Sequence, residues 1–412
     1  MPCGYTCSNL KAGCAFLGLS IAVHAGQGAP AGEPEEPFAR DSAIVLEEGE
    51  DFLLSAVMSP DGVSAYFATS TAPSQVVKLD LDSFERVNAI TLGGGENAPR
   101  SAIISPDGAK AWFGTNTTPG RVVEINLVDF ERAGDLVLPF GDNVLNTAVI
   151  APDGSAAYFG TGTSPGRVVK VNLDTLELEE SIVLPPGEDY LRSSVISPDG
   201  STAYFGTDTF PGQVVKVDLL TFERVDTITL PEGEDRLECA VISPDGSAAW
   251  FATNTIPGRI IKVDLTNFER AESLELPHAD GPPWAAVIAP DGSAAYFGMG
   301  TNPGQVVKVD LQEFERASAI VLEPGEANLT SAVIAPDGSA AYFGNSASPG
   351  QIVKVTLPTP PPLPIPGDFN QDGCVDFRDF VILLENWGQE YMGTFMDFGA
   401  FVALLENWWR GC

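Results

Sequence analysis

Apolar residues along the chain fall into short runs that are separated by turn residues. Residues 193–230 show the arrangement in the runs SSVIS, TAYFGT, QVVKVDL and ERVDTITL, which are rich in β-branched and aromatic residues. The segments between the first three runs carry Pro, Gly, Asp or Ser, the residues that turns favour. Runs of this length and composition, bounded by turns, predict four consecutive β-strands.

The same four runs repeat along most of the chain. A Pro-Asp-Gly turn marks each copy, and successive turns lie 46 residues apart without an insertion. A fixed period in this range is typical of propeller blades or of helical arrays, and the strand content excludes the helices. We therefore predict an all-β fold, a seven-bladed β-propeller of four-stranded blades, over residues 38–357. The seven turns carry Asp61, Asp107, Asp153, Asp199, Asp245, Asp291 and Asp337.

Each second strand contains an aromatic residue followed by Phe, such as Tyr204 and Phe205. Adjacent residues of a strand point to opposite faces of its sheet. The pair therefore predicts a blade that its neighbours cover on both faces, and this packing is favoured over an aromatic ligand platform.

The phase of the repeat predicts how the ring closes. Residues 358–362, PTPPP, follow the third strand of the last copy and lack the N–H donors that a strand needs. Residues 38–46 match the fourth-strand pattern and precede the first turn. The N-terminal segment is therefore expected to complete the last blade by pairing with residues 351–357, which leaves only short outer edges.

The repeat resembles that of the YVTN family of seven-bladed propellers. The resemblance rests on the Ser-Pro-Asp-Gly turn, the aromatic strand that ends near Thr, and the Val-Val-Lys-Val-Asp run, and it covers residues 38–357. Tyr-Phe-Gly-Thr stands where the family has its name-giving tetrad. The resemblance implies an extracellular surface or binding role and no single reaction.

The charge and the histidine content of the chain argue against several classes of function. It has 22 Lys and Arg against 56 Asp and Glu, a net charge of −34, and so lacks the basic face that nucleic-acid binding needs. The two histidines, His24 and His278, are too few for multi-histidine metal sites and argue against His-dependent catalytic triads. We expect a monomer with no nucleic-acid partner and no membrane span.

The N-terminus resembles a secretory signal peptide. Residues 1–25 combine Lys11, an apolar run from Ala12 to Val23 and a small-residue cleavage pattern, and the run is too short for a permanent membrane helix. A disordered cytosolic leader is the alternative. Residues 26–37 predict a solvated acidic linker. We therefore expect a secreted protein, extracellular or on the cell surface.

Two columns of the repeat carry candidate binding chemistry. One is acidic in every copy and lies in the loop before each inner strand, so it predicts either a ring of carboxylates that attracts cations or a basic partner, or an ordinary solvated loop. It consists of Glu50, Glu96, Asp142, Glu188, Glu234, Asp280 and Glu326.

The other column lies four residues later, at the expected central mouth, and it varies among the copies. Such variation indicates either a ligand site, which Arg and aromatic residues favour, or drift at exposed positions. The column consists of Leu54, Arg100, Asn146, Arg192, Glu238, Trp284 and Thr330. The candidate ligand-binding residues are Arg100, Arg192, Glu238 and Trp284 of this column, with Tyr190 and Arg236 from the preceding loops.

A proline-rich spacer, residues 358–366, leads to a motif in residues 367–412 that is typical of an EF-hand calcium loop. The motif offers side-chain oxygens at loop positions 1, 3, 5, 9 and 12, a carbonyl at position 7 and glycine at position 6. Apolar residues at helical spacing follow and predict a helix. An acidic surface loop is the alternative. The predicted calcium ligands are Asp368, Asn370, Asp372, Asp376, Asp379 and the Cys374 carbonyl.

Residues 367–412 resemble a type I dockerin domain, because the segment from Val375 to Trp387 recurs 21 residues later. The second loop has lost its ligands, so we expect one calcium ion. The resemblance implies a small α-helical domain that binds a cohesin module through Phe377 and Arg378. A calcium-stabilised cap without a partner is the alternative. Because Cys374 and Cys412 are the only cysteines of this small module, we also expect a disulfide between them.

These features predict a secreted, non-catalytic binding or attachment protein. Its propeller would bind a carbohydrate or protein ligand, and its terminal module would dock to a cohesin-like or cell-surface protein. The alternative is an extracellular lyase or hydrolase that acts on polysaccharide at the propeller mouth. Clustered carboxylates in a deep pocket there would favour the enzyme.

Overall fold

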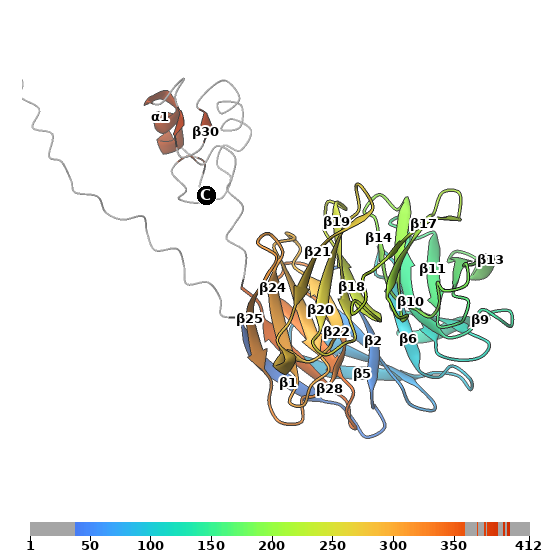
Figure 1. The fold of residues 1–412 in the computed structure, drawn as a ribbon. Helices are drawn as coiled ribbons and strands as arrows, with labels where there is room; N and C mark the ends of the chain where they lie inside the picture. The colour runs from blue at the N-terminus through green and yellow to red at the C-terminus, as the bar shows by residue number, and fades with distance from the viewer. Residues whose placement is uncertain are drawn as a thin grey trace, which may run out of the picture. The chain divides into compact units, whose positions relative to one another are not determined.

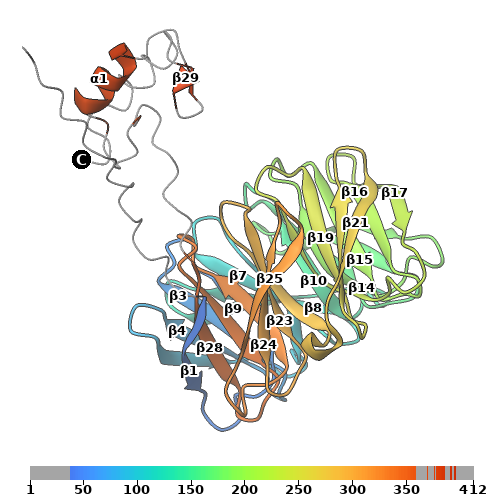
Figure 2. The same ribbon diagram turned by 60° about the vertical axis from the view of Figure 1, so that its left-hand side comes forward.

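The computed structural model describes residues 38–358, 369, 375, 377–385, 390–391 and 394–395. Residues 38–357 form a ring of seven antiparallel four-stranded sheets, seen from two sides in Figure 1 and Figure 2. The first strand of each sheet lies innermost and contacts the first strands of the sheets on either side. The predicted seven-bladed propeller is therefore confirmed.

The first four blades contain strands of six or seven residues. Blade 1 has β2 (Leu53–Met58), β3 (Ser64–Thr69), β4 (Gln75–Asp80) and β5 (Glu85–Thr91); blade 2 has β6 (Pro99–Ile104), β7 (Lys110–Thr115), β8 (Arg121–Asn126) and β9 (Glu131–Val137); blade 3 has β10 (Leu145–Ile150), β11 (Ala156–Thr161), β12 (Arg167–Asn172) and β13 (Glu177–Val183); blade 4 has β14 (Leu191–Ile196), β15 (Thr202–Thr207), β16 (Gln213–Asp218) and β17 (Glu223–Thr229).

The remaining blades follow the same plan, except that the last takes its outer strand from the N-terminal end of the ring. Blade 5 has β18 (Leu237–Ile242), β19 (Ala248–Thr253), β20 (Arg259–Asp264) and β21 (Glu269–Glu275); after the short 3-10 helix η1 (His278–Asp280), blade 6 has β22 (Pro283–Ile288), β23 (Ala294–Met299), β24 (Gln305–Asp310) and β25 (Glu315–Val321); blade 7 has β26 (Leu329–Ile334), β27 (Ala340–Asn345), β28 (Gln351–Thr356) and β1 (Ala39–Val45).

The hydrophobic core lies between the blades. The second strand of each blade is almost wholly buried, and its Phe, such as Phe205, has no exposed surface. Phe205 shares a cluster with Tyr158 of the preceding blade, whereas Tyr204 shares the next cluster with Phe251 of the following blade. Adjacent aromatic residues thus fill two different interfaces, as the alternation of a strand requires.

The Pro-Asp-Gly turns also connect neighbouring blades. Asp199 accepts hydrogen bonds from the Ser197 hydroxyl and the Ser201 N–H, and these bonds lower the pKa of Asp199 to about 2. Gly200 has a φ of 71°, and a Cβ there would lie 2.6 Å from the Pro152 ring of the preceding blade. Glycine is needed for two reasons: its backbone has the left-handed conformation, and it packs directly on Pro152.

The ring closes as the sequence predicts. Strand β1 pairs antiparallel with β28, with Ala43 opposite Val353, and both figures show blue β1 beside orange β28 (Figure 1, Figure 2). Phe38 packs against Tyr296, with ring centroids 5.6 Å apart. The start of the described chain therefore supplies the last blade with both a strand and core surface.

Near the C-terminus, the structure describes α1 (Phe377–Glu385), β29 (Glu390–Tyr391) and β30 (Thr394–Phe395). The helix lies where the apolar spacing predicts one. Leu383 is fully buried, but Val381 and Leu384 are 36% and 55% exposed, so only part of the predicted apolar face is covered. The expected signal peptide and both linkers lie outside the described residues, except for Pro358.

We expect that removal of β1 will open the ring. A chain that begins at residue 47 would expose the outer edge of β28, which favours aggregation, and would lose the contact of Phe38 with Tyr296. Size-exclusion chromatography and thermal unfolding should show oligomers and a lower Tm than a control chain that begins at residue 36. A monomer that melts like the control would show that closure does not depend on β1.

Candidate functional site

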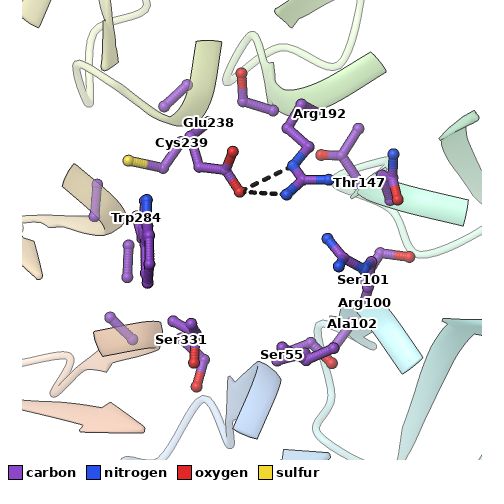
Figure 3. Close-up of a pocket in the computed structure, with 18 of the residues that line it drawn as sticks. Ser55, Arg100, Ser101, Ala102, Thr147, Arg192, Glu238, Cys239, Trp284 and Ser331 are labelled. Atoms are coloured by element: carbon purple, nitrogen blue, oxygen red, sulfur yellow. Dashed lines mark hydrogen bonds and ion pairs between the residues drawn. The ribbon is translucent and has the colours of Figure 1, made fainter. Parts of the chain in front are cut away.

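The inner strands surround a central cavity of about 480 Å³. Figure 3 shows Arg100, Arg192, Glu238 and Trp284 arranged around a common open centre. All seven residues of the variable column line it, so the structure brings together the candidate residues Arg100, Arg192, Glu238 and Trp284. They come from β6, β14, β18 and β22, four different blades.

The cavity exists because the residues beneath the mouth are small. Along each inner strand, alternate residues are partly exposed and the residues between them are mostly buried. The first exposed position belongs to the variable column. The second, which also lines the cavity, holds Ala56, Ala102, Ala148, Ser194, Ala240, Ala286 and Ala332.

The inner strands are bonded to each other by side chains of the buried positions. The Ser101 hydroxyl donates to the Leu145 carbonyl at 3.1 Å, and the Ser193 hydroxyl donates to the Leu237 carbonyl at 2.9 Å. These bonds hold neighbouring inner strands at a fixed spacing. The variable side chains therefore project from a rigid frame.

One side of the mouth carries a polar network across three blades. Arg192 donates from Nε to Glu238 Oε1 at 2.9 Å, and its Nη2 lies 2.8 Å from the same oxygen (Figure 3). Asn254 Nδ2 donates to Glu238 Oε2 at 3.1 Å, and the Trp284 indole N–H donates to Asn254 Oδ1 at 3.0 Å. Both carboxylate oxygens of Glu238 thus have partners, and the indole ring is fixed in orientation.

Arg100 lies next to this network and forms no ion pair within the part of the chain that the structure describes. Its Nε is buried and has no acceptor among these residues. Burial lowers the pKa of Arg100, the nearby charge of Arg192 lowers it further, and the carboxylates of Glu238 and Asp208, which are paired with other arginines, partly offset this decrease. The pocket therefore contains one cation without a counter-ion from residues 38–358.

Two candidate residues lie outside the lining of the pocket. Tyr190 is 46% exposed in the loop before β14, and Arg236 is ion-paired to Asp208, with 2.7 Å between Nε and Oδ1. Asn254, in contrast, lines the pocket and was missed. It belongs to a second variable column 16 residues after the first, and that variation was the signal that would have revealed it. This column consists of Ser70, Asn116, Gly162, Asp208, Asn254, Gly300 and Ser346.

Cys239 also lines the pocket, at the position where five of the other six blades have Ser or Thr. Its Sγ lies 4.0 Å from the Pro283 carbonyl, and burial raises the pKa of its thiol. A thiol with a raised pKa is a poor nucleophile, because the thiolate is the reactive form. Cys239 is therefore better suited to packing than to nucleophilic attack.

The acidic column is neither a cation-attracting ring nor a solvated loop, so both expectations were wrong. Its side chains are buried, with each residue at most 5% exposed. Among the described residues, no group of three or more acidic, His or Cys side chains is arranged to hold a metal ion. Six of the carboxylates form ion pairs with the Arg of the following outer strand, in the pairs Arg40–Glu326, Arg86–Glu50, Arg132–Glu96, Arg224–Glu188, Arg270–Glu234 and Arg316–Asp280.

Five of the acidic residues also join two blades, because a Gly N–H of the preceding blade donates to the backbone carbonyl of Glu50, Asp142, Glu188, Glu234 and Glu326. Glu50 lies between β1 of blade 7 and β2 of blade 1; its backbone carbonyl accepts from Gly350 N–H of blade 7 at 2.8 Å. Its carboxylate accepts from Arg86 Nε of blade 1 at 2.9 Å. A Cβ at Gly350 would lie 2.8 Å from the Glu50 carbonyl oxygen, so glycine permits this approach. We call this arrangement of acidic residue, Arg and Gly the inter-blade latch.

Blade 3 has a different latch, because Leu178 replaces the Arg. Asp142 accepts instead from Arg167 Nη1 at 3.3 Å and from the Ser181 hydroxyl at 2.9 Å. The shorter Asp side chain therefore keeps charged and hydroxyl partners from the same blade. A buried carboxylate without partners would be costly, which explains the substitute contacts.

Of the predicted calcium ligands, the structure describes Asp379 alone. Its side chain is fully buried at the start of α1, and its Oδ1 accepts from the Phe369 N–H at 2.7 Å. The predicted partner-binding residues Phe377 and Arg378 are both exposed on α1. The remaining ligands and the expected disulfide lie outside the described residues, at Asp368, Asn370, Asp372, Cys374, Asp376 and Cys412.

The propeller is similar in fold to the hydrazine synthase of Kuenenia stuttgartiensis. The TM-score is 0.66 at 17% sequence identity, and the match covers 77% of this chain and 98% of that chain. At this identity the likeness shows the fold alone. No protein-family description matches the chain, and the comparison with curated proteins finds no match. No helix in the described part of the chain is long and apolar enough to cross a membrane.

Loss of one latch should destabilise the propeller. Arg270→Met removes the partner of Glu234, whose side chain is 5% exposed, and should lower the free energy of unfolding by about 1–3 kcal/mol because a buried charge is left unpaired. Chemical denaturation measures this change. The control is Arg259→Met in the same blade, whose partner Glu275 is 53% exposed, and its cost should stay below about 1 kcal/mol. Equal costs would mean that the latch contributes no more than a surface ion pair.

Proposed function

We propose that this chain is a secreted, non-catalytic binding protein whose propeller recognises a ligand at the central pocket. The observation that carries the proposal is the contrast between the columns of the repeat. Residues that pack the blades or form latches are nearly constant, whereas the residues at the pocket mouth differ from blade to blade. Variation that places Arg, Glu and Trp side chains around one concave site supports recognition there.

The chemistry of the pocket favours binding over polysaccharide hydrolysis. Glycoside hydrolysis ordinarily uses two carboxyl groups on either side of the scissile bond. Among the described residues that line the pocket, Glu238 is the one acidic side chain, and both of its oxygens are hydrogen-bonded. Burial also raises the pKa of the Cys239 thiol, which disfavours the thiolate that a nucleophilic mechanism would need.

The terminal module would attach the protein to a partner. An oxygen-rich donor set suits Ca²⁺, which prefers carboxylate and carbonyl ligands. The buried Asp379 accepts from the N–H of Phe369, the second residue of the proposed loop, so this twelfth-position carboxylate lies against the start of the loop. The exposed Phe377 and Arg378 would contact a cohesin-like or cell-surface protein. The bound ion would hold the loop in the conformation that presents them.

Substitution of the mouth should abolish ligand binding and preserve the fold. In the double variant Arg192→Ala with Trp284→Ala, ligands that the wild-type chain captures from a glycan array or an extracellular fraction should be lost. The propeller should still fold, because both positions vary among the blades. Circular dichroism checks the fold.

The matched control is Phe210→Ala with Arg259→Ala, which removes the same kinds of side chain outside the pocket; Phe210 is 74% exposed. It should bind as wild type does. Undiminished capture by the mouth variant would place the ligand site elsewhere on the propeller.

Calcium should bind once per chain. Asp372→Ala should abolish binding in calorimetric titration of the calcium-depleted chain, and it should remove the calcium dependence of the C-terminal melting transition because metal binding contributes folding free energy. Gln389→Ala, in the degenerate second loop, is the control and should bind as wild type does. Two equivalent sites, or none, would contradict the assignment of the first loop.

The same two variants test attachment. Capture of a partner from the extracellular fraction should require calcium in the wild type and in Gln389→Ala, and it should fail with Asp372→Ala. If capture persists after calcium removal, attachment does not depend on the metal site.

A further inference from the structure

We propose that the pocket binds a small ring-bearing ligand with a single negative charge, whose acid group contacts Arg100 and whose ring lies on Trp284. The inference rests on the proposed role of the pocket as a ligand site and names the chemical class of the ligand. Figure 3 shows the two side chains on opposite sides of the open centre, with the Arg100 guanidinium directed inward.

The charges around the mouth single out Arg100. Arg192 is neutralised by Glu238, and Arg236 is neutralised by Asp208. Arg100 has no such partner among the described residues, although its Nε is buried. The chain has a net charge of −34, so carboxylates far outnumber cations. An arginine that nevertheless has no carboxylate partner inside a cavity is a candidate site for an external anion.

The guanidinium also favours an anion with two oxygens in one plane. Arginine presents a planar fork of N–H donors that matches the two oxygens of a carboxylate. Burial leaves the charge of Arg100 incompletely solvated and thereby lowers its pKa. A bound anion would compensate for the lost water. An acid group at this position would therefore supply the hydrogen bonds that the guanidinium has lost through burial.

Trp284 supplies a rigid ring surface. Its indole N–H is held by Asn254, and a Cβ at Gly300 would lie 2.5 Å from the indole ring, so the absence of a side chain there makes room for the ring. An aromatic side chain that is already fixed loses little conformational entropy when a ligand stacks on it. Sugar rings and aromatic rings both present the apolar face that such stacking needs.

A single negative charge fits the pocket better than a double one. The Arg192–Glu238 pair contributes no net charge, so Arg100 leaves the described lining with one uncompensated positive charge. A dianion such as a phosphate monoester would keep one unneutralised charge inside a strongly acidic protein. Carboxylates attached to a ring, as in uronic acids or aromatic acids, meet both requirements.

Two pairs of probes test the inference on the full chain: benzoate against benzamide, and galacturonate against galactose. Ligand-observed NMR titration at 150 mM NaCl gives the Kd of each. At least one acid should bind tenfold or more tightly than its neutral partner, and the pair that responds distinguishes an aromatic from a saccharide ligand. Arg100→Gln should weaken that acid at least tenfold and leave the neutral partner unchanged. Trp284→Ala should weaken both.

Arg259→Gln is the control, because it makes the same change in net charge at an arginine outside the pocket. The inference is overturned if neither acid binds below 50 mM, or if Arg259→Gln weakens the acid as much as Arg100→Gln does. Equal binding of acid and neutral probes, both lost in Trp284→Ala, would also overturn the anion assignment. That last result would leave the pocket as a ligand site, so the proposed function would survive it.

Discussion

The antiparallel pairing of β1 with β28 is the interaction on which the rest of the structure depends. A blade of this protein is apolar on both faces and cannot bury either face alone, so each sheet needs a neighbour on both sides. A linear stack would always leave two uncovered ends. Because β1 completes the blade that begins with β26, the two ends of the ring belong to one sheet, and every aromatic interface is filled.

The sequence predicts the fold almost completely, because each strand and turn is specified locally and then repeated. The regular spacing of the Pro-Asp-Gly turns determines the blade boundaries, and the fourth-strand pattern of residues 38–46 predicts the closure. The lining of the mouth was predicted in part: Arg100, Glu238 and Trp284 belong to a variable column that lines it, whereas Asn254 was missed and Arg236 lies outside it. Tyr190 was misplaced because nothing in the pattern shows whether a loop residue points toward the pocket.

The latch was missed because, in sequence, a buried acidic residue of a loop cannot be distinguished from a solvated one, even where it recurs in every repeat. Information about it was nevertheless present. Arg occupies one outer-strand position in six blades, and in the blade where Leu178 breaks that column the acidic residue is Asp142, although Asp280 of blade 6 keeps its Arg316. An acidic column and a basic column that recur at the same spacing in nearly every copy indicate a possible contact, and such pairs could be searched for in any repeat protein before its structure is known.

The separation of the latches from the mouth has an evolutionary consequence. Latches, turns and aromatic pairs maintain the frame at positions that do not line the cavity, whereas side chains at the mouth such as Arg100 and Trp284 belong to none of these contacts. Substitutions at the mouth are therefore close to neutral for folding. A lineage of such proteins could exchange one ligand for another through a few point mutations, without an inserted loop and without passing through an unstable intermediate.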